Sequence, residues 1–137
     1  MAQPMKVKEV CDFDLNSYRG RNLVLFFYIK DFAKLCTVEA IAFRDKIEYF
    51  HSFETEVIGV SKDPVDTHVK FSEEFSLPFT LVSDPKDALR QRFGLKDFMK
   101  CRATVLVDSV GKERFRYCSL FDPVSHVRET LRVLSEL

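Results

Sequence analysis

Apolar residues occur along the chain in short runs that are typical of a sheet covered by helices. The longest uninterrupted run, Leu23 to Ile29, is too short for a buried helix and is rich in aromatic and branched residues. It therefore predicts a central strand that is covered on both faces. Runs at Glu56 to Ser61 and Phe79 to Val82 predict two more strands. Helices must flank such a sheet.

The segment from Cys36 to Phe50 has helical periodicity with two apolar stripes. One stripe contains Ala40, Phe43, Ile47 and Phe50, and the other contains Val38, Ile41, Ala42 and Tyr49. Two stripes indicate two buried contacts. Both contacts lie within the domain, or the second stripe meets a partner subunit, as in a homodimer; the sequence leaves these alternatives open.

Turn and capping residues divide the rest of the chain. Asp63-Pro64 predicts a helix that runs to about Phe75, and Ser83-Asp84-Pro85 predicts one that ends at Gly94, a natural left-handed cap. The C-terminal segments are two strands, 103–108 and 113–119, joined by a hairpin turn, and a final helix opened by Asp122-Pro123.

This order of elements predicts an α/β fold. Three strand–helix units favour parallel pairing with right-handed crossovers, and the hairpin adds antiparallel strands. The result is a mixed five-stranded sheet with helices on both faces, a thioredoxin-like fold with one extra strand–helix unit. With 137 residues, 46% of them apolar, the chain is expected to form a single domain over residues 1–137.

Charge and hydropathy narrow the range of functions. The chain has 21 basic and 21 acidic residues, so the electrostatic attraction that drives binding to nucleic acid or anionic membranes is missing. Its apolar runs are shorter than the roughly 18 residues of a membrane span, and the N-terminus lacks a signal-peptide core. We therefore expect a soluble, cytoplasmic protein with no nucleic-acid or membrane partner.

Cysteine provides the main candidate chemistry. Cysteines 11, 36, 101 and 118 include no C-x-x-C pair, and each is expected to be a free thiol. Cys36 opens the helix that follows the central strand, where unpaired N–H groups and the helix dipole favour a reactive thiolate. The alternative is that Cys36 is a small buried apolar residue. Cys11 and Cys118 are weaker candidates, and Cys101 beside Arg102 is ambiguous.

Other kinds of site have little support. Histidines 51, 68 and 126 lack the close spacing of zinc ligands, and glycines 20, 59, 94 and 111 are isolated rather than grouped in a phosphate-binding loop. We therefore expect neither a metal nor a cofactor.

Several segments resemble the peroxiredoxins of the AhpC/TSA family, and most of all the bacterioferritin-comigratory-protein branch. They are LVLFFYIKDFAKLCTVEAIAFRD, DTHVKF, LPFTLVSDP and CRATVLVD. The resemblance extends from about Leu15 to the C-terminus. It implies that Cys36 is the nucleophile that attacks a hydroperoxide and becomes a sulfenic acid. It also implies that Arg102 stabilises the thiolate and the peroxide oxygens, and that Glu39 supports Arg102.

The loop before Cys36 departs from the family pattern. Ile29 and Ala33 stand where the family has Pro and Thr, and Lys34-Leu35 replaces a Pro-Gly pair. The missing Thr hydroxyl would bind the peroxide, and losing one such donor typically costs about 10² to 10³ in rate. The active-site loop is therefore degenerate, unless another hydroxyl such as Thr37 or Tyr28 compensates.

The family's resolving cysteine would fall at Ile41. Cys11, Cys101 or Cys118 could resolve the sulfenic acid instead, but a single-cysteine cycle completed by an external thiol is favoured. The main hypothesis is a thiol-dependent peroxidase that reduces hydrogen peroxide or organic hydroperoxides, with a thiol reductant such as thioredoxin. The alternative is a catalytically impaired module that serves as a redox sensor or structural subunit. A disulfide oxidoreductase is disfavoured without C-x-x-C.

Overall fold

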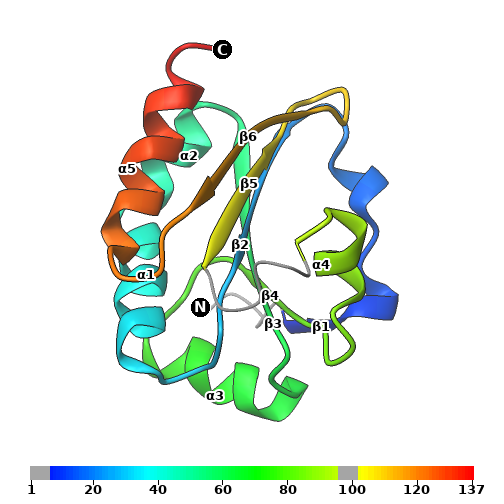
Figure 1. The fold of residues 1–137 in the computed structure, drawn as a ribbon, viewed down its shortest axis with the longest axis vertical. Helices are drawn as coiled ribbons and strands as arrows, with labels where there is room; N and C mark the ends of the chain where they lie inside the picture. The colour runs from blue at the N-terminus through cyan, green and yellow to red at the C-terminus, as the bar shows by residue number, and fades with distance from the viewer. Residues whose placement is uncertain (1–6, 96–101) are drawn as a thin grey trace, which may run out of the picture.

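A six-stranded mixed sheet runs through the computed structural model, which describes residues 7–95 and 102–137 (Figure 1). In spatial order the strands are β1 (Val7–Glu9), β4 (Thr80–Ser83), β3 (Thr55–Ser61), β2 (Asn22–Phe27), β5 (Ala103–Val107) and β6 (Glu113–Cys118). The first four are parallel to one another, and β5 and β6 are antiparallel to their neighbours. The predicted mixed sheet is confirmed, but it has six strands rather than the expected five, because β1 was not predicted.

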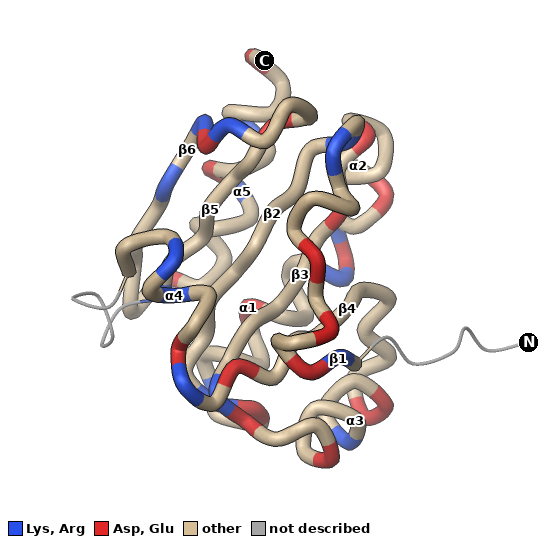
Figure 2. Tube along the Cα trace, turned by 90° about the vertical axis from the view of Figure 1, so that its right-hand side faces the viewer, with Lys and Arg blue, Asp and Glu red and all other residues tan. Residues whose placement is uncertain are grey.

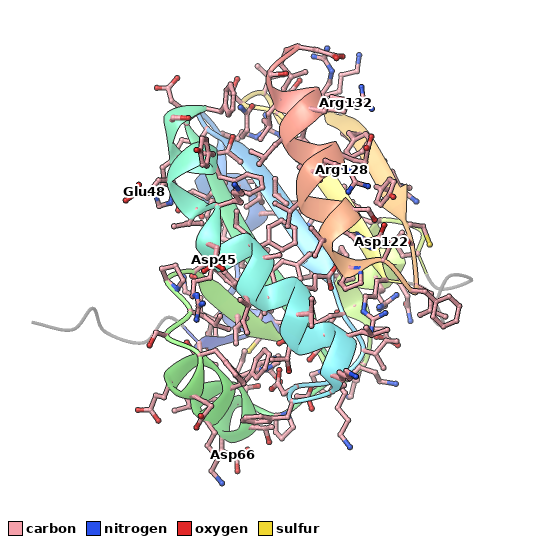
Figure 3. The ribbon with its side chains drawn as sticks, turned by 90° about the vertical axis from the view of Figure 1, so that its left-hand side faces the viewer. Asp45, Glu48, Asp66, Asp122, Arg128 and Arg132 are labelled. Carbon is pink, nitrogen blue, oxygen red and sulfur yellow. The ribbon has the colours of Figure 1, made fainter. Side chains whose placement is uncertain are left out.

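Helices cover both faces of this sheet. They are α1 (Lys34–Asp45), α2 (Ile47–Ser52), α3 (Val65–Glu74), α4 (Ala88–Arg92) and α5 (Pro123–Leu134), with 3₁₀ turns at Val10–Asp12 and Leu15–Tyr18. In Figure 1, α1, α2 and α5 lie on one side of the sheet and α4 with the 3₁₀ turns on the other, and Figure 3 shows α1 and α5 side by side. Within the described ranges, no helix has the length and apolar character needed to cross a membrane.

The helix predicted over residues 36–50 is two helices. Lys46, with φ −109° and ψ 11°, leaves the helical conformation and its N–H bonds to Phe43 O, which ends α1. The inner apolar stripe is confirmed, because Ala40, Phe43 and Phe50 are buried. The outer stripe is partly open, with Val38 38% and Tyr49 57% exposed. Packing of this stripe against a partner subunit stays a prediction.

The central strand separates two apolar clusters, as expected for a strand covered on both faces. Alternate residues of β2 point to opposite sides. Val24 and Phe26 face α1 and α5, where Phe26 stacks on Phe43 with ring centroids 4.5 Å apart, while Leu25 and Phe27 face the α4 side. The strands β2 and β5 carry no charged residue, and the Lys, Arg, Asp and Glu positions lie mostly around them (Figure 2).

Close packing makes Gly59 on β3 a sensitive position. A Cβ atom there would lie 2.8 Å from both Leu81 Cδ2 and Phe26 Cζ. Gly59→Ala is therefore expected to lower the free energy of unfolding by about 1–3 kcal/mol through overpacking, as measured by urea unfolding. Val110→Ala, at a 69% exposed position, is the control and should change stability by less than about 0.5 kcal/mol. Equal midpoints for the two variants would contradict this packing argument.

Candidate active site

Cys36 lies at the beginning of α1, just after the end of the central strand. Ala33 is the N-cap residue and makes no side-chain capping bond, and the first helical hydrogen bond joins Thr37 N–H to Ala33 O at 2.8 Å. Cys36 is thus the third residue of the helix, and its own N–H is among those without an intrahelical acceptor. This position is the one predicted from the sequence.

Arg102 meets Cys36 because of the sheet register. Ala103 on β5 pairs with Phe27 at the end of β2, so residue 102 lies beside the chain that leads to α1. Arg102 Nη2 donates to Cys36 Sγ at 3.4 Å, and Nη1 donates to the carbonyl of Leu120. Both Cys36 and Arg102 are buried, at 0% and 4% exposure. A guanidinium fixed in this way can stabilise negative charge on the sulfur.

Glu39, one turn further along α1, completes the predicted group. Its side chain is fully buried, and its Oε1 lies 4.0 Å from Arg102 Nε. Burial raises the pKa of this carboxyl well above its ordinary value, and the positive charge of Arg102 opposes that rise. The structure therefore brings together Cys36, Glu39 and Arg102, the three residues that the resemblance to the family implied, although the Glu39–Arg102 contact is longer than a hydrogen bond. Their catalytic roles stay a prediction.

Two residues that the sequence analysis did not place in the site extend this group. His126 on α5 lies with Nδ1 3.5 Å from Glu39 Oε2 and 2.8 Å from Thr104 Oγ1, and its Nε2–H donates to Ser119 O at 2.8 Å. Thr104 could have been found, because it lies on β5 two residues after Arg102, which directly precedes the strand, and extended residues two apart face the same way. The contact between Glu39 and His126 had no local signal.

A second buried polar cluster holds the loop before Cys36. Tyr28 Oη donates to Asp31 Oδ1 at 2.6 Å, and Asp31 Oδ2 lies 2.6 Å from His68 Nδ1. His68 Nε2–H donates to Val82 O at 3.1 Å. The short contact between His68 Nδ1 and Asp31 Oδ2 therefore needs a second proton, either on Nδ1 or on the carboxyl. The Tyr28 hydroxyl is thereby directed to Asp31, which leaves the proposed compensation by Tyr28 without support.

The same cluster raises the question of a metal. The ligand atoms of Asp31, Asp63 and His68 all lie within 4.8 Å of one another. Two tetrahedral zinc ligands with bonds of about 2.0–2.1 Å would stand roughly 3.3 Å apart, whereas the Asp31 and His68 atoms are 2.6 Å apart. Asp63 also already accepts from Asp31 N–H and the Ser61 hydroxyl. The geometry fits a shared proton better than a zinc ion.

The loop before Cys36 has an unusual conformation. Phe32 adopts a left-handed φ of 67°, which is strained for a bulky residue, and its ring packs edge-on against Phe71 with centroids 5.1 Å apart. Ile29 and Phe32 are both exposed. The loop is therefore held by Phe71 and by the Asp31 cluster, and Ala33 adds no hydroxyl near the sulfur.

The other cysteines differ from expectation. Cys11 is a free, exposed thiol, and Cys36 is a free, buried one. Cys118 is disulfide-bonded, so the expectation that every cysteine is a free thiol is wrong for this residue. Sequence spacing gave no signal for the bond. Cys101 lies outside the described residues.

Comparison with known proteins identifies the family. The AhpC/TSA family profile matches residues 2–116. The chain belongs to the AhpC/TSA family. Among its peroxiredoxin relatives, Bacillus subtilis peroxiredoxin Bcp is 36% identical over 133 residues, which cover 89% of this chain and 85% of the relative. Chloroplastic peroxiredoxin Q of rice is 37% identical over 127 residues, 90% of this chain. The chain spans only 58% of the length of that rice relative.

Solved peroxiredoxin structures share this fold. The bacterioferritin comigratory protein of Xanthomonas campestris superposes with a TM-score of 0.83 at 27% identity, covering 90% of this chain and 84% of the other. Mycobacterium tuberculosis BcpB gives a TM-score of 0.81 at 27% identity over the same shares of the two chains. The resemblance to this branch of the peroxiredoxins and the thioredoxin-like fold are thus both confirmed.

Proposed function

We propose that this peroxiredoxin is a thiol-dependent peroxidase whose nucleophile is Cys36. The single observation that carries the proposal is the buried guanidinium of Arg102, 3.4 Å from Cys36 Sγ at the start of α1. The related Xanthomonas campestris protein has been studied for alkyl peroxide reduction, which supports hydrogen peroxide or organic hydroperoxides as the substrate class.

The chemistry follows from the charges at the site. The Cys36 thiolate attacks one peroxide oxygen, so that an S–O bond forms as the O–O bond breaks. The sulfur becomes a sulfenic acid, and the departing oxygen takes up a proton to leave as water or an alcohol. Negative charge moves from the sulfur to that departing oxygen. Arg102 stabilises both ends of this movement, because its fork of donors is fixed in place by the carbonyl of Leu120.

An external thiol completes the cycle in this proposal. The thiol attacks the sulfenic sulfur, releases water and forms a mixed disulfide, which a second thiol then reduces. Ile41 stands at the family's resolving position, and Cys118 is already disulfide-bonded. Cys11 is free but exposed, whereas Cys36 is buried. These observations favour a single-cysteine cycle with a reductant such as thioredoxin.

A second candidate function is an impaired module that acts as a redox sensor or structural subunit. Two observations favour it: the Cys36 side chain has 0% exposure, and Ala33 supplies no hydroxyl at the helix start. Under this alternative the fold and the buried polar groups are kept for stability, and Cys36 meets peroxide too rarely to turn over.

Trapping the sulfenic acid separates the two candidates. A stoichiometric pulse of hydrogen peroxide, followed by a sulfenic-acid trap and peptide mass spectrometry, is expected to label Cys36. Exposed Cys11 serves as the internal control, because it lacks the site's contacts and should stay unlabelled. A parallel pulse of cumene hydroperoxide tests organic substrates. An unmodified Cys36 after both pulses would reject the peroxidase and leave the impaired module.

A further inference from the structure

Glu39 and His126 form a buried acid–base pair behind Arg102. They come from α1 and α5, which lie side by side (Figure 3), and neither side chain is exposed. Among the described residues, neither Glu39 carboxyl oxygen has a hydrogen-bond partner at normal distance. A buried carboxylate without hydrogen bonds is costly. The carboxyl at this place is therefore more stable when it carries or shares a proton.

The hydrogen bonds of His126 show which atom can exchange that proton. Ser119 O can only accept, so Nε2 keeps its hydrogen. The remaining nitrogen, Nδ1, faces both Glu39 Oε2 and the Thr104 hydroxyl. Because a hydroxyl can donate or accept, Thr104 satisfies Nδ1 with or without a hydrogen. The ring is thus held in place while Nδ1 remains open to either protonation state.

We propose that Glu39 and His126 hold one proton between them, which keeps the pair neutral and makes His126 a positioning residue that keeps a negative charge on Glu39 away from Arg102, the cation beside the Cys36 sulfur. The two atoms that can carry this proton, Glu39 Oε2 and His126 Nδ1, face each other at 3.5 Å. The consequence for peroxide reduction rests on the proposed function, but the shared proton does not.

The other groups around His126 agree with this assignment. Arg102 and Thr104 face it from the β5 side, the Tyr117 ring of β6 meets it edge-on at 5.0 Å, and Asp122 lies at the start of α5. Burial lowers the pKa of His126 most; the Ser119 carbonyl raises it, Arg102 lowers it, and Asp122 raises it. Since burial also raises the pKa of Glu39, burial favours a neutral carboxyl beside a neutral ring over a carboxylate beside a charged ring.

Loss of this proton has a defined effect on the site. As pH rises through the raised pKa of Glu39, the carboxyl gains a full negative charge whose Oε1 is 4.0 Å from Arg102 Nε. The carboxylate then competes with the sulfur for the positive charge of Arg102, which stabilises the sulfur less. The rate of reaction of Cys36 with peroxide is therefore expected to fall at pH values above the pKa of Glu39. This decrease at high pH is assigned to the Glu39–His126 pair.

Two substitutions of His126 separate proton sharing from a structural role. His126→Gln keeps an N–H for the Ser119 carbonyl but has no acceptor facing Glu39, whereas His126→Asn keeps the acceptor and loses the Ser119 bond. The readout is the infrared carboxylic-acid band of Glu39, assigned by its loss in Glu39→Gln. In His126→Gln the band should disappear about one pH unit lower than in the wild type, a tenfold change in acidity, and His126→Asn should stay near the wild type.

Two results would overturn the proposal. One is a wild-type protein with no Glu39 carboxylic-acid band at neutral pH, which the comparison with Glu39→Gln decides even if a His126 variant fails to fold. The other is a shift of the Glu39 band in His126→Asn with no shift in His126→Gln. That result would mean that only the hydrogen bond of His126 to Ser119 affects the carboxyl. In the peroxide assay, the decrease of the rate at high pH should be absent in Glu39→Gln. A wild type that consumes no peroxide would refute the proposed function but leave the infrared result standing.

Discussion

Cys36→Ser is expected to reduce peroxide consumption to the rate of the reductant alone. A serine hydroxyl is far less acidic than a thiol and is a weak nucleophile without an adjacent base. Arg102, the described side chain that bonds to Cys36 Sγ, stabilises an anion but does not remove a proton. The measurement is loss of hydrogen peroxide or cumene hydroperoxide with dithiothreitol or thioredoxin as reductant. Turnover by the serine variant equal to that of the wild type would remove Cys36 as the nucleophile.

Cys11→Ser is the matched control for this substitution. It makes the same chemical change at the other free thiol in the described part of the chain, which is exposed in the 3₁₀ turn Val10–Asp12. The single-cysteine cycle predicts an unchanged rate for this variant with either reductant. A Cys11→Ser protein that still forms the sulfenic acid but no longer turns over would show instead that Cys11 resolves it.

Much of the fold could be predicted because its signals are local. The run Leu23 to Ile29 indicated a strand covered on both faces, and alternate residues of β2 do fill two separate clusters. Gly94 has the left-handed φ of 68° expected of a helix cap. Asp122 accepts from Ser125 N–H at the start of α5, as its capping position predicted. In each case a few neighbouring residues decide the conformation.

Features set by distant contacts could not be predicted. β1 is a three-residue edge strand, held by its pairing with β4 rather than by an apolar pattern of its own. The break at Lys46 is hidden, because apolar residues continue with helical spacing into α2. In the site, Arg102 could be assigned from the resemblance to the family, but the pairing of Glu39 with His126 depends on how α1 and α5 pack together.

Arg102→Gln is expected to lower the rate of peroxide reduction by about 10² to 10³, the usual loss when a preorganised donor to developing charge is removed. Glutamine keeps a planar donor but lacks the positive charge, and its shorter side chain cannot reach Cys36 Sγ and the Leu120 carbonyl together. The rate of Arg102→Lys should lie between those of the wild type and Arg102→Gln, because an ammonium group keeps the positive charge but loses the forked arrangement of donors. The measurement is the second-order rate constant for oxidation of Cys36 by hydrogen peroxide.

Arg116→Gln provides the matched control for this loss of charge. Arg116 on β6 is much more exposed than Arg102 and pairs with Glu113, so its removal should leave the rate constant unchanged. Because Arg102 is buried beside Glu39, its loss also removes the cation that opposes the raised pKa of that carboxyl. Glu39 should then keep its proton to higher pH, which moves the infrared band of the acid in the direction opposite to His126→Gln. Rate constants within about twofold of each other for Arg102→Gln and Arg116→Gln would mean that the guanidinium stabilises the fold and takes no part in the reaction.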